Sequence, residues 1–219
     1  MVLPDGRCDI IMRRHANNRQ ARHTPIITGP ATRAYHVDYS AGDQWFGIRL
    51  RPEYGAALWQ DQLNLAQDSV LRGPAALDRL PALQLLLGAE ITLDALAQFI
   101  HRQTWTVVDL RLTRAIEVIH ASGGRVSINA LAERVACSER HLNRLFRHSV
   151  GLSGKTYGQL VQFHRAVRLV TIGKLPITAA AFESGYADHA HMTRSFRRFG
   201  GFTPSNVPPD VTMPDFLPN

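Results

Sequence analysis

The chain has 219 residues, which is long enough for one large or two small domains. Its hydrophobic content of 45% is typical of a packed globular protein. No apolar run approaches the roughly 20 residues of a membrane-spanning helix. The first residues lack the basic-then-apolar pattern of a signal peptide, so neither feature is predicted. Cys8 and Cys137 belong to no C-x-x-C motif, which argues against a disulfide framework and indicates a reducing, cytoplasmic environment.

The net charge of +7 lies almost entirely in the second half of the chain. Residues 1–105 carry +1, from 11 basic and 10 acidic side chains, whereas residues 106–219 carry +6, from 14 basic and 8 acidic ones. A basic half of this kind indicates a polyanionic partner, either nucleic acid or an anionic surface. The alternative, a solvated basic surface that only keeps the protein soluble, stays open on charge alone.

Residues 1–104 are predicted to form a small β-rich domain with trailing helices. Apolar or alternating runs predict strands over residues 8–12, 26–28 and 44–50. The turn signal Gly29–Pro30 ends the second strand, and Arg51–Pro52 ends the third because proline cannot donate to a sheet ladder. Helical patterns follow over residues 56–59, 75–87 and 93–102, and a domain boundary is predicted near Gln103–Thr104.

Residues 105–207 are predicted to be almost entirely helical. Apolar periodicity and capping residues predict helices over residues 107–120, 128–136, 138–149, 156–171, 177–184 and 188–199. The predicted N-cap residues of the second, third and last of these helices are Ser127, Ser138 and Asp188. Residues 208–219 contain four prolines and are predicted to be a disordered or extended tail.

Within the helical half, one short sequence occurs twice. Residues 141–147 read H-L-N-R-L-F-R, and residues 191–197, fifty positions later, read H-M-T-R-S-F-R. The similarity extends downstream, where residues 151–153 match residues 201–203, and upstream at an offset of forty-nine. Each copy has a short helix, a tight turn, an N-cap residue and then a basic helix. This is the order of a helix-turn-helix unit, whose second helix enters a DNA groove.

Both basic helices have an apolar stripe opposite an outward polar stripe. The apolar stripes comprise Leu142, Leu145 and Phe146 in the first helix, and Met192, Phe196 and Phe199 in the second. The outward stripes comprise Arg140, Asn143, Arg144 and Arg147 in the first, and His191, Arg194 and Arg198 in the second. Guanidinium and amide groups read guanine and adenine edges in the major groove. One such helix alone is more often a solvated surface element, but the repetition favours DNA binding.

The spacing of the two copies suits one DNA duplex. The helix predicted between them, residues 156–171, would be about 24 Å long. With its flanking turns it can hold the two basic helices about 34 Å apart, which is one turn of B-DNA. A single chain could then place both helices in successive major grooves and read a non-palindromic site.

These residues resemble the DNA-binding domain of the AraC/XylS family of bacterial transcription regulators over residues 107–207. The matching positions are Ile128-x3-Ala132, Ser138-x3-Leu142-x-Arg144-x-Phe146, Gly151-Leu152-Ser153, Ile177-x3-Ala181, Gly185-Tyr186-x-Asp188 and Phe196-x2-Phe199-Gly200-x-Thr203-Pro204. The predicted fold class is therefore α+β. It comprises a small β-rich domain with helices, followed by an all-α domain of two helix-turn-helix units joined by a linker helix.

The resemblance also implies roles for individual side chains. The base-contacting candidates are Arg140, Asn143, Arg144, His189, His191 and Arg194. The phosphate-contacting candidates are Arg147, Ser153, Lys155, Arg197, Arg198 and Thr203. Ala190 stands where some members of the family place a polar, base-contacting side chain, so the second helix is expected to read fewer bases directly than the first.

Residues 1–52 resemble, less specifically, sensor domains attached to some of these regulators. The likeness lies in Leu3-Pro4-Asp5-Gly6-x2-Asp9-Ile10, Gly29-Pro30-x2-Arg33 and Phe46-Gly47-Ile48-x-Leu50-x-Pro52. Relatives usually have additional strands before the Leu-Pro-Asp-Gly stretch. Either the chain is shortened or its sensor is reduced, which leaves open whether a closed ligand-holding barrel forms.

The function expected is that of a cytoplasmic, sequence-specific regulator that binds duplex DNA, with no enzymatic activity, catalytic residue, cofactor or metal. A small-molecule effector at residues 1–105, contact with RNA polymerase and a homodimer through residues 75–102 are open hypotheses about partners; no membrane is expected. A non-specific architectural protein is the alternative, although Asn143 in the outward stripe argues against it because phosphate binding needs no amide there. An enzyme tethered to DNA, with Cys8 as a nucleophile and His15 or His36 as its base, is the third reading.

Overall fold

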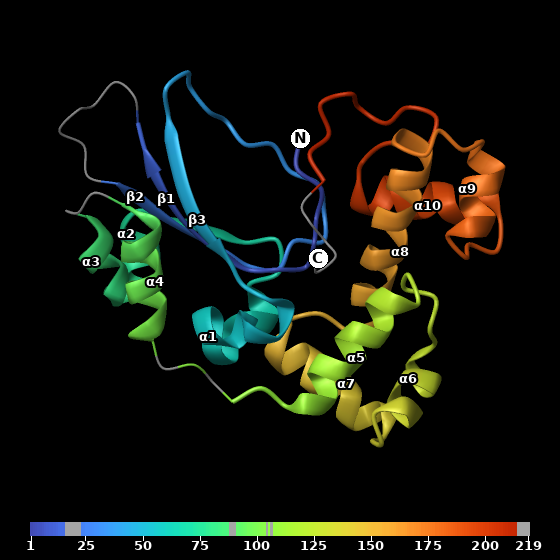
Figure 1. Cartoon of the computed structure of the whole chain (residues 1–219), viewed down its shortest axis with the longest axis horizontal. Coiled ribbons are helices and arrows are strands. Elements are labelled where there is room, and N and C mark those ends of the chain that lie inside the picture. The colour runs from blue at the N-terminus through green and yellow to red at the C-terminus, as the bar shows by residue number, and fades with distance from the viewer. Residues whose placement is uncertain (16–22, 88–90, 104, 106, 214–219) are drawn as a thin grey trace.

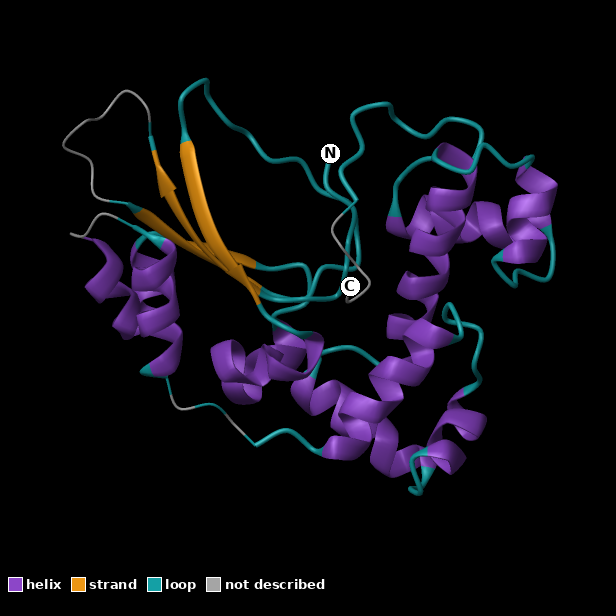
Figure 2. Cartoon of the chain, in the orientation of Figure 1, coloured by secondary structure: helices purple, strands orange, loops and turns teal. Residues whose placement is uncertain are grey.

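The computed structural model describes residues 1–15, 23–87, 91–103, 105 and 107–213. A β-sheet with several short helices is followed by an all-helical part, in the order expected for an α+β fold (Figures 1 and 2). Thr104, at the predicted domain boundary, lies outside the described residues, as do Gly88 and residues 214–219 of the predicted tail. None of the described helices is both long and apolar enough to cross a membrane.

The sheet is antiparallel, and its strands lie in the order β3-β1-β2-β4. The strands are β1 (Asp9–Arg14), β2 (Thr24–Thr28), β3 (Gln44–Arg49) and β4 (Val70–Arg72). In the centre, Ile10 is aligned with both Ile27 and Ile48. Because alternate residues of a strand point to the same face, Cys8, Ile10 and Met12 are buried together. Strands β3 and β4 are edges, so the described strands form an open sheet.

Short helices complete the core of this sheet, and several of them differ from the predictions. They are α1 (Gly55–Trp59), α2 (Pro74–Arg79), α3 (Gln84–Leu87) and α4 (Leu93–His101), with 3₁₀ helices at Pro52–Tyr54, η2 (Gln60–Leu65) and Pro81–Leu83. Proline splits the helix that was predicted over residues 75–87, because Pro81 begins a separate turn. Strand β4 was not predicted, since three residues are too few to show an alternating pattern.

The helical half agrees closely with the sequence-based predictions. Its elements are α5 (Leu110–Ala121), α6 (Ile128–Arg134), α7 (Glu139–Ser149), α8 (Gly154–Thr171), α9 (Ile177–Glu183) and α10 (His189–Phe199). The side chains of Ser127, Ser138 and Asp188 accept hydrogen bonds from backbone amides of the first turn, which confirms the three predicted caps. Ser153 caps α8 in the same way, so this helix begins two residues earlier than predicted.

Helix α8 carries the packing of both helix-turn-helix units. Near its N-terminus Tyr157 contacts Phe146 of α7, with ring centroids 6.0 Å apart. Farther along, Phe163 contacts Phe196 and Phe199 of α10, with centroids 5.2 and 5.6 Å apart. All five rings are buried in one hydrophobic core, and close packing of this kind resists relative movement. The two units therefore form one body rather than two linked ones.

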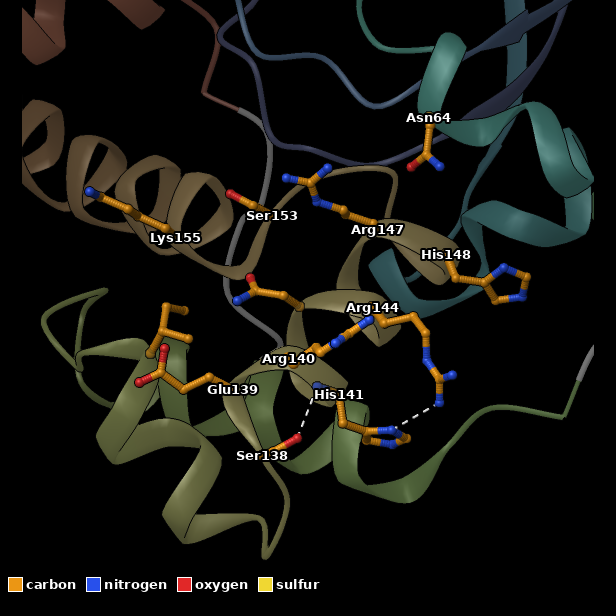
Figure 3. Close-up of a pocket in the computed structure, with 12 residues that line it drawn as sticks. Asn64, Ser138, Glu139, Arg140, His141, Arg144, Arg147, His148, Ser153 and Lys155 are labelled. Atoms are coloured by element: carbon orange, nitrogen blue, oxygen red, sulfur yellow. Dashed lines mark hydrogen bonds between the residues drawn. The ribbon is translucent and has the colours of Figure 1, made fainter.

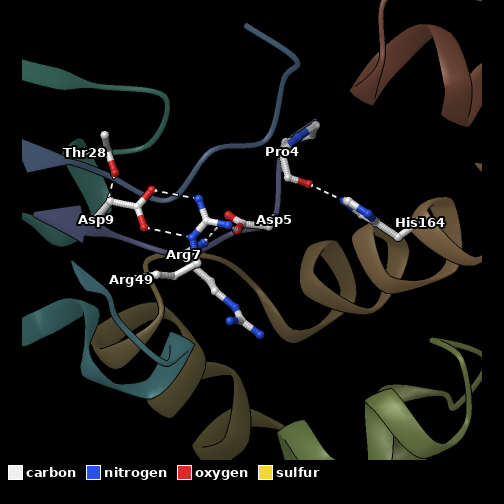
Figure 4. Close-up of polar contacts among 7 residues, drawn as sticks. All are labelled: Pro4, Asp5, Arg7, Asp9, Thr28, Arg49 and His164. Atoms are coloured by element: carbon white, nitrogen blue, oxygen red, sulfur yellow. Dashed lines mark hydrogen bonds and ion pairs between the residues drawn. The ribbon is translucent and has the colours of Figure 1, made fainter. Parts of the chain in front are cut away.

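The N-terminal segment crosses from the sheet to the helical half. Leu3 is buried in the core of the helices, and Nε2 of His164 donates a hydrogen bond of 2.7 Å to the carbonyl oxygen of Pro4 (Figure 4). Val2 forms isolated bridges with Tyr35 and Thr212. The described part of the tail thus makes a turn at residues 209–210 and is then held against the N-terminus at Thr212.

Burial makes the N-terminal contact sensitive to acid. Burial lowers the pKa of His164, and separately that of His120, to about 4. The unfolded chain binds these protons near pH 6.5, so the stability that the neutral rings contribute is present above that pH and is lost as the pH falls toward 4. At pH 5 each histidine should lower the free energy of unfolding by about 2 kcal/mol relative to pH 7.5.

Urea unfolding at pH 7.5 and pH 5 measures this loss, and His164→Gln isolates one of its sources. Glutamine can still donate to the Pro4 carbonyl but does not titrate, so the variant should lose less stability between the two pH values by about 2 kcal/mol. An equal loss in both proteins would contradict a neutral, buried His164.

Candidate nucleic-acid interface

Helix α7 is anchored by its apolar stripe and exposes its basic one. Leu142 and Phe146 are fully buried, and Leu145 is half-buried against the same core. On the opposite side Arg140, Arg144 and Arg147 are exposed, and Asn143 is half-buried. The cap at Ser138 fixes where the helix begins, so these side chains leave the surface in a defined register.

An open groove of about 1,200 Å³ runs along this exposed stripe (Figure 3). The predicted site residues that line it are Arg140, Asn143, Arg144, Arg147, Ser153 and Lys155. All three base-contacting candidates of the first copy are thus brought together with three phosphate-contacting candidates. Glu139 is the one carboxylate among the described residues that line this groove. The groove is therefore strongly basic and offers both charge and directional donors.

A short chain of polar contacts orients Arg144. Nη2 of Arg144 lies 3.0 Å from Nδ1 of His141, and because arginine can only donate, Nδ1 is the acceptor. The His141 proton then lies on Nε2, which faces Oδ2 of Asp109 at 3.9 Å, beyond hydrogen-bond distance. A side-chain hydrogen bond from Arg111 keeps Asp109 ionised by lowering its pKa to about 2. His141 was not predicted as a site residue, yet it positions the main candidate for base contact.

Ser153 and Lys155 lie where α8 begins, beside the C-terminal end of α7. Oγ of Ser153 accepts from the backbone amide of Thr156 at 3.0 Å and lies 2.9 Å from its hydroxyl. The single hydroxyl proton of Ser153 is thus shared with Thr156 or available to an external acceptor. Exposed Lys155 and the first amides of α8 provide positive potential at the same end of the groove.

The second basic helix, α10, is built in the same way but presents its polar side differently. Met192, Phe196 and Phe199 are buried, as predicted. Arg194 is exposed, whereas His191 is half-buried, with its ring edge-on to Tyr186 at a centroid distance of 5.1 Å. Part of the His191 ring is therefore committed to packing. That contact could not be predicted from the helix alone, because Tyr186 precedes it.

The remaining candidates of the second copy are distributed over two smaller hollows. His191, Arg194 and Arg198 line one of them, and Arg197 and Arg198 line the other. Arg198 is held by a 3.0 Å hydrogen bond to Oε1 of Gln159 and lies over the ring of Phe199. His189 is exposed at the first position of α10, and the hydroxyl of Thr203 lies 3.2 Å from that of Ser205. The structure places these last two apart from the grouped candidates.

Residues of the N-terminal part, among them three exposed polar ones, also line these surfaces and were not predicted as site residues. Asn64 of η2 faces the groove of α7, and Arg33 and Gln67 line the hollow at the end of α10. They lie more than seventy positions before the helices that they approach. No local pattern could have revealed them, because the contact arises only when the two parts of the chain pack together.

The catalytic and metal readings find little support in the geometry. Cys8 is buried in the sheet, where burial and the nearby carboxylates of Asp9 and Asp5 raise the pKa of its thiol, so a reactive thiolate is disfavoured. His15, one of the two bases considered, lies 3.7 Å from Asp43 instead. Within the described ranges, no group of three or more His, Cys, Asp or Glu side chains is arranged to hold a metal ion.

Comparisons with known proteins find similarity to transcription regulators that contain a helix-turn-helix domain. Residues 131–207 match the family of the helix-turn-helix domain, and residues 1–72 match a domain of unknown function (DUF6597). The HTH-type transcriptional activator RhaS of Escherichia fergusonii is 33% identical over 82 residues, which is 37% of this chain and 30% of that protein. The arabinose operon regulatory protein of Escherichia coli is 26% identical over 100 residues, 45% of this chain and 34% of that protein.

The chain thus spans about a third of the length of these curated relatives. Among solved structures, apo ToxT K231A from Vibrio cholerae overlaps 93% of this chain and 89% of that chain, at 13% identity and a TM-score of 0.45.

The cap of α10 can be tested through stability. Asp188→Ala removes the acceptor for the backbone amide of His191 and should lower the free energy of unfolding by about 1 kcal/mol. Asp188→Asn is the matched control, since its amide oxygen can accept the same bond. Urea unfolding of the two variants makes the comparison, and equal stability would show that the cap does not hold the first turn of α10.

Proposed function

We propose that this chain, whose C-terminal domain belongs to the AraC/XylS family of transcription regulators, binds duplex DNA sequence-specifically and regulates transcription. The observation that carries the proposal is the groove along α7, where Arg140, Asn143 and Arg144 converge on one exposed stripe. Guanidinium and amide groups can form paired hydrogen bonds with guanine and adenine in the major groove. The helix-turn-helix match over residues 131–207 supports the same function.

The shared core suggests how one chain reads a site. Helices α7 and α10 are the recognition helices, and α8 holds both through the rings of Tyr157 and Phe163. Because this core is closely packed, the two helices are presented to the duplex at a fixed separation. We propose that they enter successive major grooves on one face of the DNA, which requires a separation of about 34 Å.

The two recognition helices have unequal tasks in this proposal. The first offers three base-directed donors from Arg140, Asn143 and Arg144 in one groove. The second offers Arg194 and exposed His189, while His191 packs on Tyr186 and Arg198 is held by Gln159. We expect α7 to provide most of the direct base contacts and α10 to depend more on phosphates and DNA shape.

Residues 1–104 are proposed to form a regulatory domain. The hydrogen bond from His164 to Pro4 and the burial of Leu3 join this part to the helix that carries both recognition helices. A small molecule that changed the conformation of the N-terminal segment would therefore also affect the position of α8 and of the recognition helices. Thermal unfolding of the full chain with candidate effectors tests this idea, and effector, homodimer and RNA polymerase contact remain separate hypotheses.

Specificity is tested at Arg144, after duplexes that bind the chain are enriched from a random pool. Arg144→Ala should weaken binding to the enriched duplex by about 1–3 kcal/mol and relax the preference at one base pair. Arg144→Lys is the matched control, because it keeps the charge but loses the paired donors. It should retain affinity for a scrambled duplex while losing preference for the enriched one. Equal affinity of the wild type for both duplexes would favour the non-specific architectural protein.

Phosphate contact is tested at Arg197, which is exposed near the end of α10. Arg197→Ala should weaken binding to the enriched and scrambled duplexes by the same factor. It should also reduce the slope of log affinity against log salt by about one. Titrations at several salt concentrations measure both effects. A loss confined to the enriched duplex would instead assign Arg197 to base contact.

A further inference from the structure

We infer that the N-terminal part of the chain binds the DNA backbone itself, through Asn64 beside α7 and Arg33 beside α10. The inference rests on the proposed function, because it adds a second part of the protein to the same DNA complex. It concerns residues that neither the repeat nor the helix-turn-helix match includes. Its basis is the way in which two N-terminal segments extend the basic grooves of the recognition helices.

At the first groove, η2 is locked to the end of α7. Leu63 is buried against the turn that follows this helix, where a Cβ added to Gly151 would lie 2.9 Å from Cγ of Leu63. Helix α1, which runs directly into η2, is also close to α7: a Cβ on Gly55 of α1 would lie 3.0 Å from the carbonyl oxygen of Ser149 in the last turn of α7. With the backbones this close, η2 must accompany α7 when it approaches a duplex.

Asn64 is the residue of η2 that faces the groove. It is exposed, and Figure 3 shows it across the groove from Arg147. The amide group of asparagine is among the side chains that donate to phosphate oxygens in DNA complexes, although its bond is weaker than that of arginine because it carries no charge. A duplex held by Arg147 and Lys155 would therefore pass within reach of Asn64.

At the second groove, the loop that carries Arg33 is attached to the end of α10. The backbone amide of Ala34 donates a 2.7 Å hydrogen bond to the carbonyl oxygen of Phe199, the last residue of α10. Helix ends leave such carbonyl groups unpaired, so this bond completes the helix with a group from another part of the chain. Arg33 is thereby placed beside Arg197 and Arg198 in a hollow of about 510 Å³.

The charge in this hollow indicates a polyanion. Three arginines line it, and none of its nine described lining residues is acidic. Arg198 contacts the neutral side chains of Gln159 and Phe199, and Arg33 and Arg197 form no ion pair with any residue that the structure describes. The carboxylate of Asp68, on the adjoining segment, already accepts two hydrogen bonds from Thr32. Guanidiniums gathered around one hollow repel one another unless an anion offsets their charge, and a DNA phosphate is such an anion.

The two N-terminal contacts occupy corresponding places in the repeat. Ser149 and Phe199 are fifty positions apart, and the carbonyl oxygen of each lies against the N-terminal part, that of Ser149 beside Gly55 of α1 and that of Phe199 as the acceptor for the amide of Ala34. The chain therefore adds one polar side chain at the C-terminal end of each recognition helix. A single straight duplex that receives both helices would meet both additions.

The experiment measures binding of the full chain to fluorescein-labelled duplexes of about 30 base pairs, long enough for two successive major grooves. One duplex has a random sequence and the other is enriched from a random pool. The test variants are Arg33→Ala, Asn64→Asp and Asn64→Lys. The matched controls are Arg102→Ala and Gln44→Glu, exposed residues of the N-terminal part that line neither groove, and the oligomeric state of Arg102→Ala is compared with that of the wild type because Arg102 ends the segment considered for a homodimer. Thermal unfolding verifies that each variant is folded.

Arg33→Ala should weaken binding to both duplexes equally, by about 3- to 10-fold, and lower the salt slope by about one. Asn64→Asp should weaken binding to both and Asn64→Lys strengthen it, while the two controls leave it unchanged. If Arg33→Ala and Arg102→Ala bind the duplexes with the same affinity, and Arg197→Ala binds them more weakly, the inference fails. The proposed function would still stand in that case. Tighter binding by both Arg33→Ala and Asn64→Asp would also overturn it, because the N-terminal part would then obstruct the duplex. A wild-type chain that binds neither duplex refutes both.

Discussion

The aromatic side chains of α8 hold the two helix-turn-helix units in a single core. Tyr157 packs on Phe146 behind the first recognition helix, and Phe163 packs on Phe196 and Phe199 behind the second. The outward direction of every arginine on α7 and α10 depends on these buried contacts, because a helix that rotated would bury charge and expose a phenyl ring. The basic grooves are thus a consequence of what α8 buries.

Much of the helical half could be predicted from sequence because its signals are local. Ser127, Ser138 and Asp188 each precede an apolar stripe at helical spacing, and each caps a helix as expected. The face of α7 followed from periodicity alone. Strand β4 was missed because it owes its existence to pairing with β2, and the partial burial of His191 was missed because it depends on Tyr186. The roles assigned to individual side chains stay predictions.

The first nine residues connect parts of the molecule that sequence reasoning treated as separate. Arg49 of β3 forms ion pairs with Asp5 at 3.2 Å and with Asp9 at 2.9 Å, which fixes the segment to the sheet (Figure 4). A few residues away, Pro4 accepts from His164 and Leu3 enters the helical core. Such contacts join residues that are far apart in the chain, so composition and periodicity carry no trace of them. They also make the segment a direct physical connection between the sheet and α8.

The closely packed core around α8 has a consequence for the DNA that the protein could recognise. Adding one base pair between two half-sites moves the second by about 3.4 Å and rotates it by about 35° around the duplex axis. A flexible linker would absorb that change, whereas the closely packed ring contacts of Tyr157 with Phe146 and of Phe163 with Phe196 resist it. Under the proposed function, the protein's specificity therefore depends on the distance between the half-sites as well as on their bases. Evolution of a new target would have to preserve that distance or rebuild α8.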